Sequence, residues 1–114
     1  DFEVQYINGK KDWLYKGFYR TWELYREIQY KNDIIHGTDI FFYKNGSKKS
    51  EEYYENSVKL GSRIEFYESE NKKSEKYSED DNIILIEFYE SWNKKSKTIS
   101  KYGKTISKEE FLDK

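Results

Sequence analysis

The chain has 114 residues, of which 35% are hydrophobic, 19% aromatic and 38% charged. This composition excludes a thick two-layer core and favours one thin domain whose apolar side chains are mostly aromatic or isoleucine. The 21 basic and 22 acidic residues give a net charge of −1, so we expect no nucleic-acid partner. The lack of cysteine excludes disulfides, thiol chemistry and the common zinc sites. No stretch is apolar enough to predict a transmembrane segment.

Two aromatic ladders recur along the chain and predict a repeat architecture. In the first, a tyrosine is followed two positions later by an asparagine, at Tyr6, Tyr30 and Tyr54. The second is a Phe-Tyr pair with steps of 24, 24 and 22 residues, at Phe18-Tyr19, Phe42-Tyr43, Phe66-Tyr67 and Phe88-Tyr89. Fixed periods of this size are typical of proteins in which one supersecondary unit stacks on the next.

The ladders divide a single domain, residues 1–114, into a half-unit, four units and a cap. The half-unit is 1–12, the units are 13–36, 37–60, 61–82 and 83–106, and the cap is 107–114. Because the half-unit matches the second half of a unit, either further repeats precede it or it is itself an N-terminal cap. The chain begins with Asp1 rather than methionine, so we expect a trimmed product. The location stays open between the cytoplasm and export by a signal peptide removed before Asp1.

Each unit is predicted to be a β-hairpin. Alternation over residues 38–42 places Thr38, Ile40 and Phe42 on one face and Tyr43 on the other. Asn45-Gly46 is a strong hairpin signal, and the connections between units carry Asn8-Gly9 or similar pairs. No proline interrupts the pattern. We therefore expect an all-β fold, an elongated single antiparallel sheet of about nine strands in sequential order.

The last residues depart from the repeat. Ser107 and Glu110 have the spacing of a capping box, in which each side chain bonds the backbone near the other. The sequence therefore predicts a short C-terminal helix over 108–113, which would cover the last edge of the sheet.

The order Tyr-x-Asn, then Gly, then Phe-Tyr-x-Asn-Gly is most complete in residues 30–46. It resembles the MORN repeat in its bacterial variant, and most closely the repeats of the YwqK family of antitoxin components. The resemblance runs from about Tyr6 to Gly103. It departs where Trp13 and Ile83 replace the expected glycine and where the third unit is two residues short. The resemblance implies a twisted sheet of successive hairpins that binds partners and has no catalytic activity.

No residue pattern predicts catalysis, a cofactor or a metal site, so we expect that the protein is not an enzyme. His36 is the only histidine and lacks the further ligands that a metal needs. Glu51-Glu52 are adjacent on a predicted strand and point to opposite faces, so they cannot serve as paired carboxylates. The acidic run 79–81 is interpreted as solvated loop charge.

Two columns of side chains are candidates for binding. Aromatic side chains favour contact with a protein partner, and the tyrosine column comprises Tyr19, Tyr43, Tyr67 and Tyr89. Lysine pairs would form a ladder of ammonium groups that could contact anions, at Lys48, Lys49, Lys72, Lys73, Lys94 and Lys95. The alternative interpretations are a thin core for the aromatic residues and solvated, glutamate-paired strands for the lysines.

Two functions stay open from the sequence. The favoured one is a non-catalytic protein-binding scaffold, a toxin-neutralising antitoxin or immunity-type component as the resemblance implies, with a toxin or a second copy as the partner. The alternative is an exported or membrane-surface scaffold that contacts anionic lipid through the lysine ladder.

Overall fold

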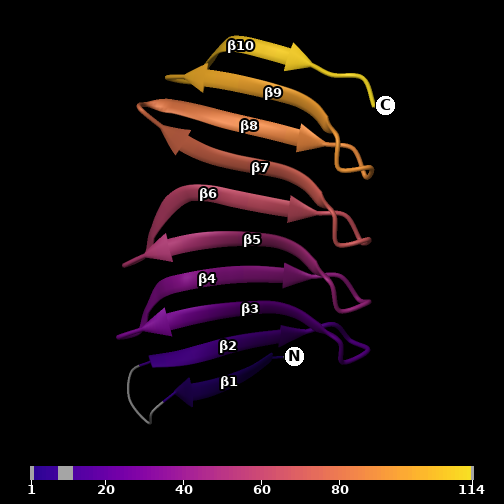
Figure 1. Cartoon of the computed structure of the whole chain (residues 1–114). Helices are drawn as coiled ribbons and strands as arrows, with labels where there is room; N and C mark the ends of the chain where they lie inside the picture. Colours follow the sequence, from indigo (N-terminus) through magenta and orange to yellow (C-terminus); the bar gives the residue numbers. More distant parts are fainter. Residues whose placement is uncertain (1, 8–11, 114) are drawn as a thin grey trace.

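The computed structural model describes residues 2–7 and 12–113, which form one open sheet (Figure 1). Neighbouring strands are antiparallel, and their spatial order is their order in the sequence. The strands are β1 (Phe2–Ile7), β2 (Asp12–Phe18), β3 (Leu24–Lys31), β4 (Ile34–Phe42), β5 (Lys48–Glu55), β6 (Val58–Phe66), β7 (Lys72–Glu79), β8 (Asn82–Phe88), β9 (Lys94–Lys101) and β10 (Lys104–Glu110). The expected elongated single antiparallel sheet is confirmed, with extents of 49 × 33 × 19 Å. The expected Asn8-Gly9 connection lies outside the described residues.

The C-terminal helix expected over 108–113 is wrong. Residues 104–110 form β10, which pairs with β9 from Lys104↔Lys101 to Glu110↔Ser96. Beyond β10, the Phe111 amide donates to the carbonyl oxygen of Lys95 at 2.9 Å, so the pairing continues past the strand end. A capping box stabilises a helix only locally. The open edge of β9 offers a full row of backbone hydrogen bonds, so residues 104–110 are more stable as a strand.

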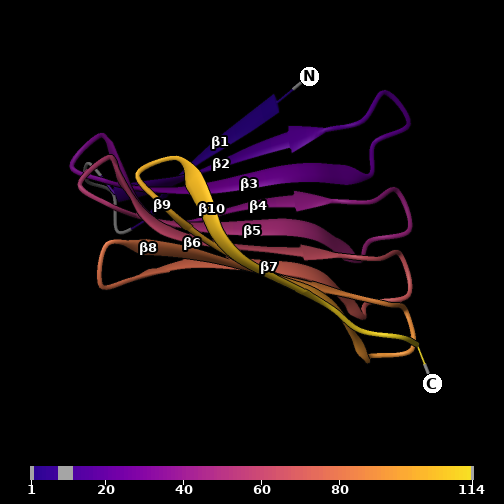
Figure 2. The same cartoon turned by 90° about the horizontal axis from the view of Figure 1, so that it is seen from above.

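Two kinds of turn alternate along the sheet and lie at opposite ends of the strands (Figures 1 and 2). On one side the turns have two residues that both adopt positive φ, as at Asn32 (52°) and Asp33 (64°). This is the type I′ hairpin, whose twist matches that of the strands and which favours asparagine, aspartate and glycine. The other members are Asn56-Ser57, Asp80-Asp81 and Tyr102-Gly103.

On the other side, each Phe-Tyr pair leads into a longer turn. The amide of Gly46 donates to the Tyr43 carbonyl at 3.0 Å, and the Tyr43 amide donates to the Ser47 carbonyl at 2.9 Å. This is a type I turn followed by one left-handed residue, here Gly46 with φ of 92°. The same pattern recurs with Trp22, Glu70 and Trp92 in the position of Gly46.

A bulge explains why one unit has 22 residues rather than 24. Between β3 and β4, Ile28 pairs with Asp39 but Tyr30 pairs with Ile35, so one residue of β3 opposes three of β4. Gly37 lies in this bulge with φ of 117°. The β5–β6 ladder has the same irregularity, whereas the β7–β8 ladder runs without a shift. The unit that lacks two residues is therefore the one that lacks the bulge.

Figure 2 shows that the described residues form a single layer, and some of the side chains buried in it are charged. Among the described residues no large side chain is fully buried, and the buried hydrophobic residues are Ile28, Ile40, Ile84 and Ile86. The carboxylates of Asp39, Glu51 and Glu52 are buried as well, and those of Asp39 and Glu51 lie directly opposite isoleucines. One row across the sheet reads Ile40, Glu51, Ile64, Glu75, Ile86 and Lys97.

The left-handed turn position gives a stability test. Replacing Glu70 by glycine should raise the free energy of unfolding by about 1 kcal/mol, because glycine adopts positive φ without steric cost. Replacing Gly46 by alanine should lower it by a similar amount, since a Cβ there meets no atom within 4 Å and only the backbone changes. Urea denaturation of the two variants measures both effects. Equal stabilities for Glu70→Gly and the unchanged chain would contradict the assignment of strain to this position.

Candidate functional site

The tyrosine column joins each unit to the next. The Tyr43 hydroxyl donates to the backbone carbonyl of Phe66 at 2.7 Å, and this bond recurs in every unit. The other pairs are Tyr19 with Phe42, Tyr67 with Phe88, and Tyr89 with Phe111. Burial, with help from Glu68 and Glu65, raises the pKa of Tyr43, which keeps its hydroxyl protonated as a donor. The column expected to bind a partner thus has a structural role that the sequence did not reveal.

One bulged residue covers each ring of the column. The pairing of β4 with β5 passes from Phe41↔Ser50 to Phe42↔Lys48, which leaves Lys49 unpaired. The Lys49 ammonium lies over the Tyr43 ring, 5.8 Å from its centroid, a cation–π arrangement. The equivalent pairs are Lys73 over Tyr67 and Lys95 over Tyr89, both at 5.8 Å, and the ring of Tyr25 against Tyr19 at 5.5 Å.

The six lysines of the expected ladder separate into two columns. The second lysine of each pair lies over a tyrosine, whereas Lys48 and Lys72 turn toward the isoleucine–carboxylate row. Lys48 forms an ion pair with Glu51 at 2.6 Å, and Lys72 forms one with Glu75 at 3.5 Å. Burial raises the pKa of Glu51, but hydrogen bonds from Lys48 and Tyr53 outweigh it, and the pKa stays below its ordinary value.

The other face of the sheet, opposite the isoleucine–carboxylate row, carries ion pairs made by arginine side chains. Arg26 makes two hydrogen bonds to Asp39, at 2.9 and 3.1 Å, and this pairing raises the pKa of Arg26. Arg63 contacts both Glu52 and, at 3.3 Å, Glu65. Because buried charges are costly unless paired, these contacts explain how Asp39 and Glu52 can be nearly inaccessible in a single sheet.

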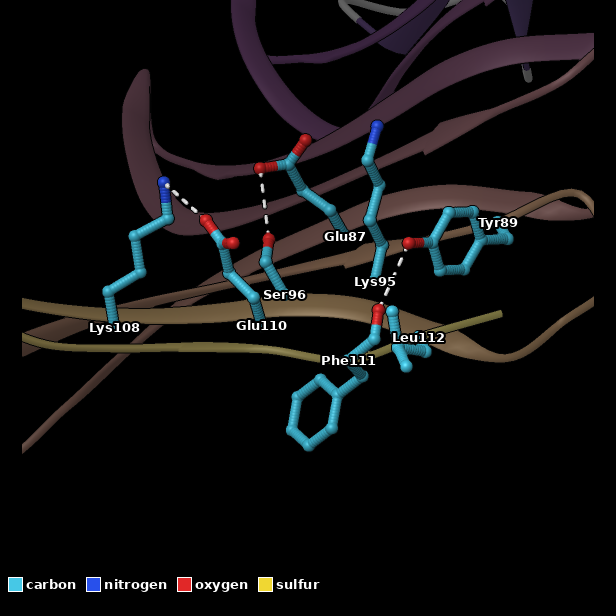
Figure 3. Close-up of a pocket in the computed structure, with 8 residues that line it drawn as sticks. All are labelled: Glu87, Tyr89, Lys95, Ser96, Lys108, Glu110, Phe111 and Leu112. Atoms are coloured by element: carbon cyan, nitrogen blue, oxygen red, sulfur yellow. Dashed lines mark hydrogen bonds and ion pairs between the residues drawn. The ribbon is translucent and has the colours of Figure 1, made fainter. Parts of the chain in front are cut away.

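A hollow of about 420 Å³ lies at the C-terminal end of the tyrosine column (Figure 3). Its lining includes Glu87, Lys95 and Ser96, and the Ser96 hydroxyl donates to Glu87 at 3.2 Å. Lys108 and Glu110 of β10 also line it, and they form an ion pair at 3.6 Å. The charges balance within the hollow, so its geometry favours neither an anionic nor a cationic ligand.

The tail after β10 follows the path of a further unit. Phe111 accepts from Tyr89, as Phe42, Phe66 and Phe88 accept from the preceding tyrosines. Asp113 accepts from the side chains of Ser91 and Asn93, and these bonds lower the pKa of its carboxyl. The phenylalanine ladder therefore has a member that the sequence analysis assigned to a helix.

The described residues contain no group of three or more histidine or acidic side chains that could hold a metal. His36 of β4 instead accepts a hydrogen bond at Nδ1 from the backbone amide of Asn56, in the turn after β5, at 3.3 Å. Glu79, Asp80 and Asp81 are exposed, in and beside a type I′ turn. Within the described part of the chain, no helix could cross a bilayer.

Two tryptophans that the sequence did not single out lie in the longer turns. Trp22 and Trp92 are 71% and 67% exposed and adopt φ of 75° and 78°. Aligning the turns by their Phe-Tyr pairs would have shown that both residues stand where the second unit has Gly46. Large apolar rings in a strained and exposed position make these two turns candidates for contact with a partner.

No protein-family model, curated protein or solved structure matches the chain. The resemblance to the MORN repeat is therefore an expectation from the sequence alone, and the geometry of the described residues carries the functional argument.

The hydrogen bond from each tyrosine to the next unit can be tested at Tyr67. Replacing Tyr67 by phenylalanine should lower the free energy of unfolding by about 1 kcal/mol, because the Phe88 carbonyl loses a partner while the ring stays. Tyr77→Phe is the matched control, since the Tyr77 hydroxyl makes no hydrogen bond among the described residues. Urea denaturation compares the two, and equal losses would contradict a joining role for Tyr67.

Proposed function

We propose that this protein is a non-catalytic repeat scaffold that binds a protein partner along the side of its longer turns. The observation that carries the proposal is the pair of exposed tryptophans, Trp22 and Trp92, in a backbone position that favours glycine. Tryptophan is among the residues most enriched in the energetic centres of protein interfaces.

The cost of these tryptophans supports a binding role. A side chain in the left-handed region costs about 1 kcal/mol relative to glycine. In the free chain an exposed ring gains little to offset this, whereas a ring buried by a partner gains about 1.5–3 kcal/mol. Strain at an exposed aromatic residue is therefore a reason to infer function there.

The spacing of the two tryptophans favours a macromolecular partner over a small ligand. Their turns follow β2 and β8 and lie on the same side of the sheet (Figure 1). Six strand spacings separate these turns, or about 29 Å in a flat sheet. One ligand of drug size would not reach both, whereas a protein interface of ordinary size would.

The tyrosine column borders this surface. Tyr19 and Tyr89 begin the two turns that carry tryptophan, and Tyr43 and Tyr67 begin the two turns between them. We propose that partner contact includes exposed parts of these rings next to the tryptophans. The resemblance to antitoxin components supports a toxin as the partner, and a second copy of the chain is the alternative.

Replacing both Trp22 and Trp92 by glycine separates binding from stability. We expect the double variant to be at least as stable as the unchanged chain, since glycine relieves the backbone strain. We also expect it to lose partner binding by at least ~2 kcal/mol, which is more than tenfold. The measurement is capture from lysate of the native cell on immobilised protein, quantified by mass spectrometry, with thermal melts of both proteins.

Glu70→Gly is the control, because it changes the same turn position without removing an aromatic ring. Sedimentation of the unchanged chain tells a second copy apart from a different partner. Partner recovery that is the same for the double variant and the unchanged chain would overturn the proposal.

Contact with anionic lipid is the second candidate, favoured by the exposed ammonium groups of Lys49, Lys73 and Lys95 in register over the tyrosines. Each lysine near a negatively charged bilayer contributes about 1 kcal/mol. Changing all three to glutamine should abolish sedimentation with phosphatidylserine vesicles, and neither protein should sediment with phosphatidylcholine alone. If the triple variant and the unchanged chain bind phosphatidylserine equally, this candidate is excluded.

A further inference from the structure

One lysine breaks the row of alternating isoleucines and carboxylates. In β5 and β7 the row holds Glu51 and Glu75, and each accepts an ion pair from the lysine three residues earlier. In β9 the equivalent position is Lys97, which lies opposite Ile86 exactly as Glu75 lies opposite the same residue from β7. Two ammonium groups, those of Lys94 and Lys97, therefore stand where the other units have an ammonium and a carboxylate.

The charge of the whole hairpin β9–β10 follows the same trend. Residues 94–110 contain six lysines and two acidic residues, whereas the equivalent residues 72–87 contain three lysines and five acidic residues. Cross-strand pairing places Lys104 opposite Lys101, which lies on the same face as Lys97. Every residue of β10 is exposed. The hairpin is thus a basic surface at one end of the sheet, with a net charge of +4 against −5 for the rest of the chain.

Glu109 is the carboxylate nearest to this surface in the pairing, because it lies opposite Lys97 on β10. Within the described part of the chain, Glu109 is exposed and makes no ion pair, and the acidic residue of β10 that does so is Glu110, with Lys108. Lys94 and Lys97 likewise have no ion-pair partner among the described residues.

We infer that the face of the β9–β10 hairpin carrying Lys94, Lys97 and Lys101 binds an acidic segment of a protein partner, with a partner carboxylate between Lys94 and Lys97. The Lys48–Glu51 and Lys72–Glu75 pairs show that the lysine equivalent to Lys94 donates to a carboxylate on this face of the sheet. The inference rests on the proposed protein-binding function and names the chemistry of the partner.

The surroundings favour a short acidic segment over an extended polyanion. The exposed Asp80-Asp81 turn neighbours the turn of this hairpin on one side of the sheet (Figure 1). Glu90 and Asp113 lie at the other end of its strands. A nucleic acid or a bilayer that covered the hairpin would bring its phosphates against these carboxylates. A short segment would avoid them, because charges beyond about 8 Å are largely screened at physiological salt.

The chain supplies its own matched variants. Lys97→Glu recreates the lysine–glutamate pair with which two other units already fold, so it removes the site without threatening the sheet. Glu75→Lys should create a second such site in β7. Lys76→Glu changes the net charge as Lys97→Glu does, but at an exposed residue on the opposite face.

The probe is a short fluorescent peptide of alternating glutamate and serine, and fluorescence anisotropy measures its binding. We expect Lys97→Glu to weaken binding about tenfold, Glu75→Lys to strengthen it, and Lys76→Glu to have a much smaller effect. Circular dichroism confirms that each variant is folded. The Trp22→Gly, Trp92→Gly double variant should bind the peptide normally, so a failure of this inference and a failure of the proposed function are distinguishable.

Three results would overturn the inference. The first is equal peptide binding by Lys97→Glu and the unchanged chain. The second is an equal loss for Lys76→Glu, which would indicate attraction by net charge alone. The third is tighter binding, at the same salt concentration, to a single-stranded oligonucleotide or to phosphatidylserine vesicles than to the peptide, which would assign the basic hairpin to a phosphate-bearing partner.

Discussion

The hydrogen bond from a tyrosine hydroxyl to the phenylalanine carbonyl of the next unit is the side-chain contact that recurs between all the successive units. A single layer cannot bury one face against another, so each unit must be held by its neighbours. The backbone ladders supply part of this cohesion, and the tyrosines add a side-chain bond at the same place in each unit. The turns, the covering lysines and the exposed tryptophans are all positioned relative to this column.

The period and the alternation in the sequence were sufficient to predict the fold. They could not predict β10, because a capping box is a local signal and the unpaired edge of β9 is a feature of the folded sheet. The same limit applies to the bulge at Gly37. The sequence has two fewer residues in the third unit, but only the pairing register explains which irregularity disappears with them.

The candidate site was less predictable than the fold. The tyrosine and lysine columns are visible as repeated residues in the sequence. The acceptor of each tyrosine hydroxyl is a backbone carbonyl, which every residue has, so the sequence cannot indicate it. The separation of Lys48 from Lys49 depends on a bulge that the alternation does not reveal. Trp22 and Trp92 were overlooked for another reason. A turn residue is informative only when its φ is known, and an exposed tryptophan without that angle is unremarkable.

Because each tyrosine hydroxyl donates to a backbone carbonyl, this hydrogen bond does not depend on the side chains of the unit that follows. Excision of residues 37–60 would bring Tyr19 before the backbone of Phe66, which offers the same carbonyl that Phe42 offers now. The sheet can therefore gain or lose whole hairpins without any repacking of a core. The distance between the two turns that carry tryptophan would then change in steps of one hairpin, which is two strand spacings or about 10 Å.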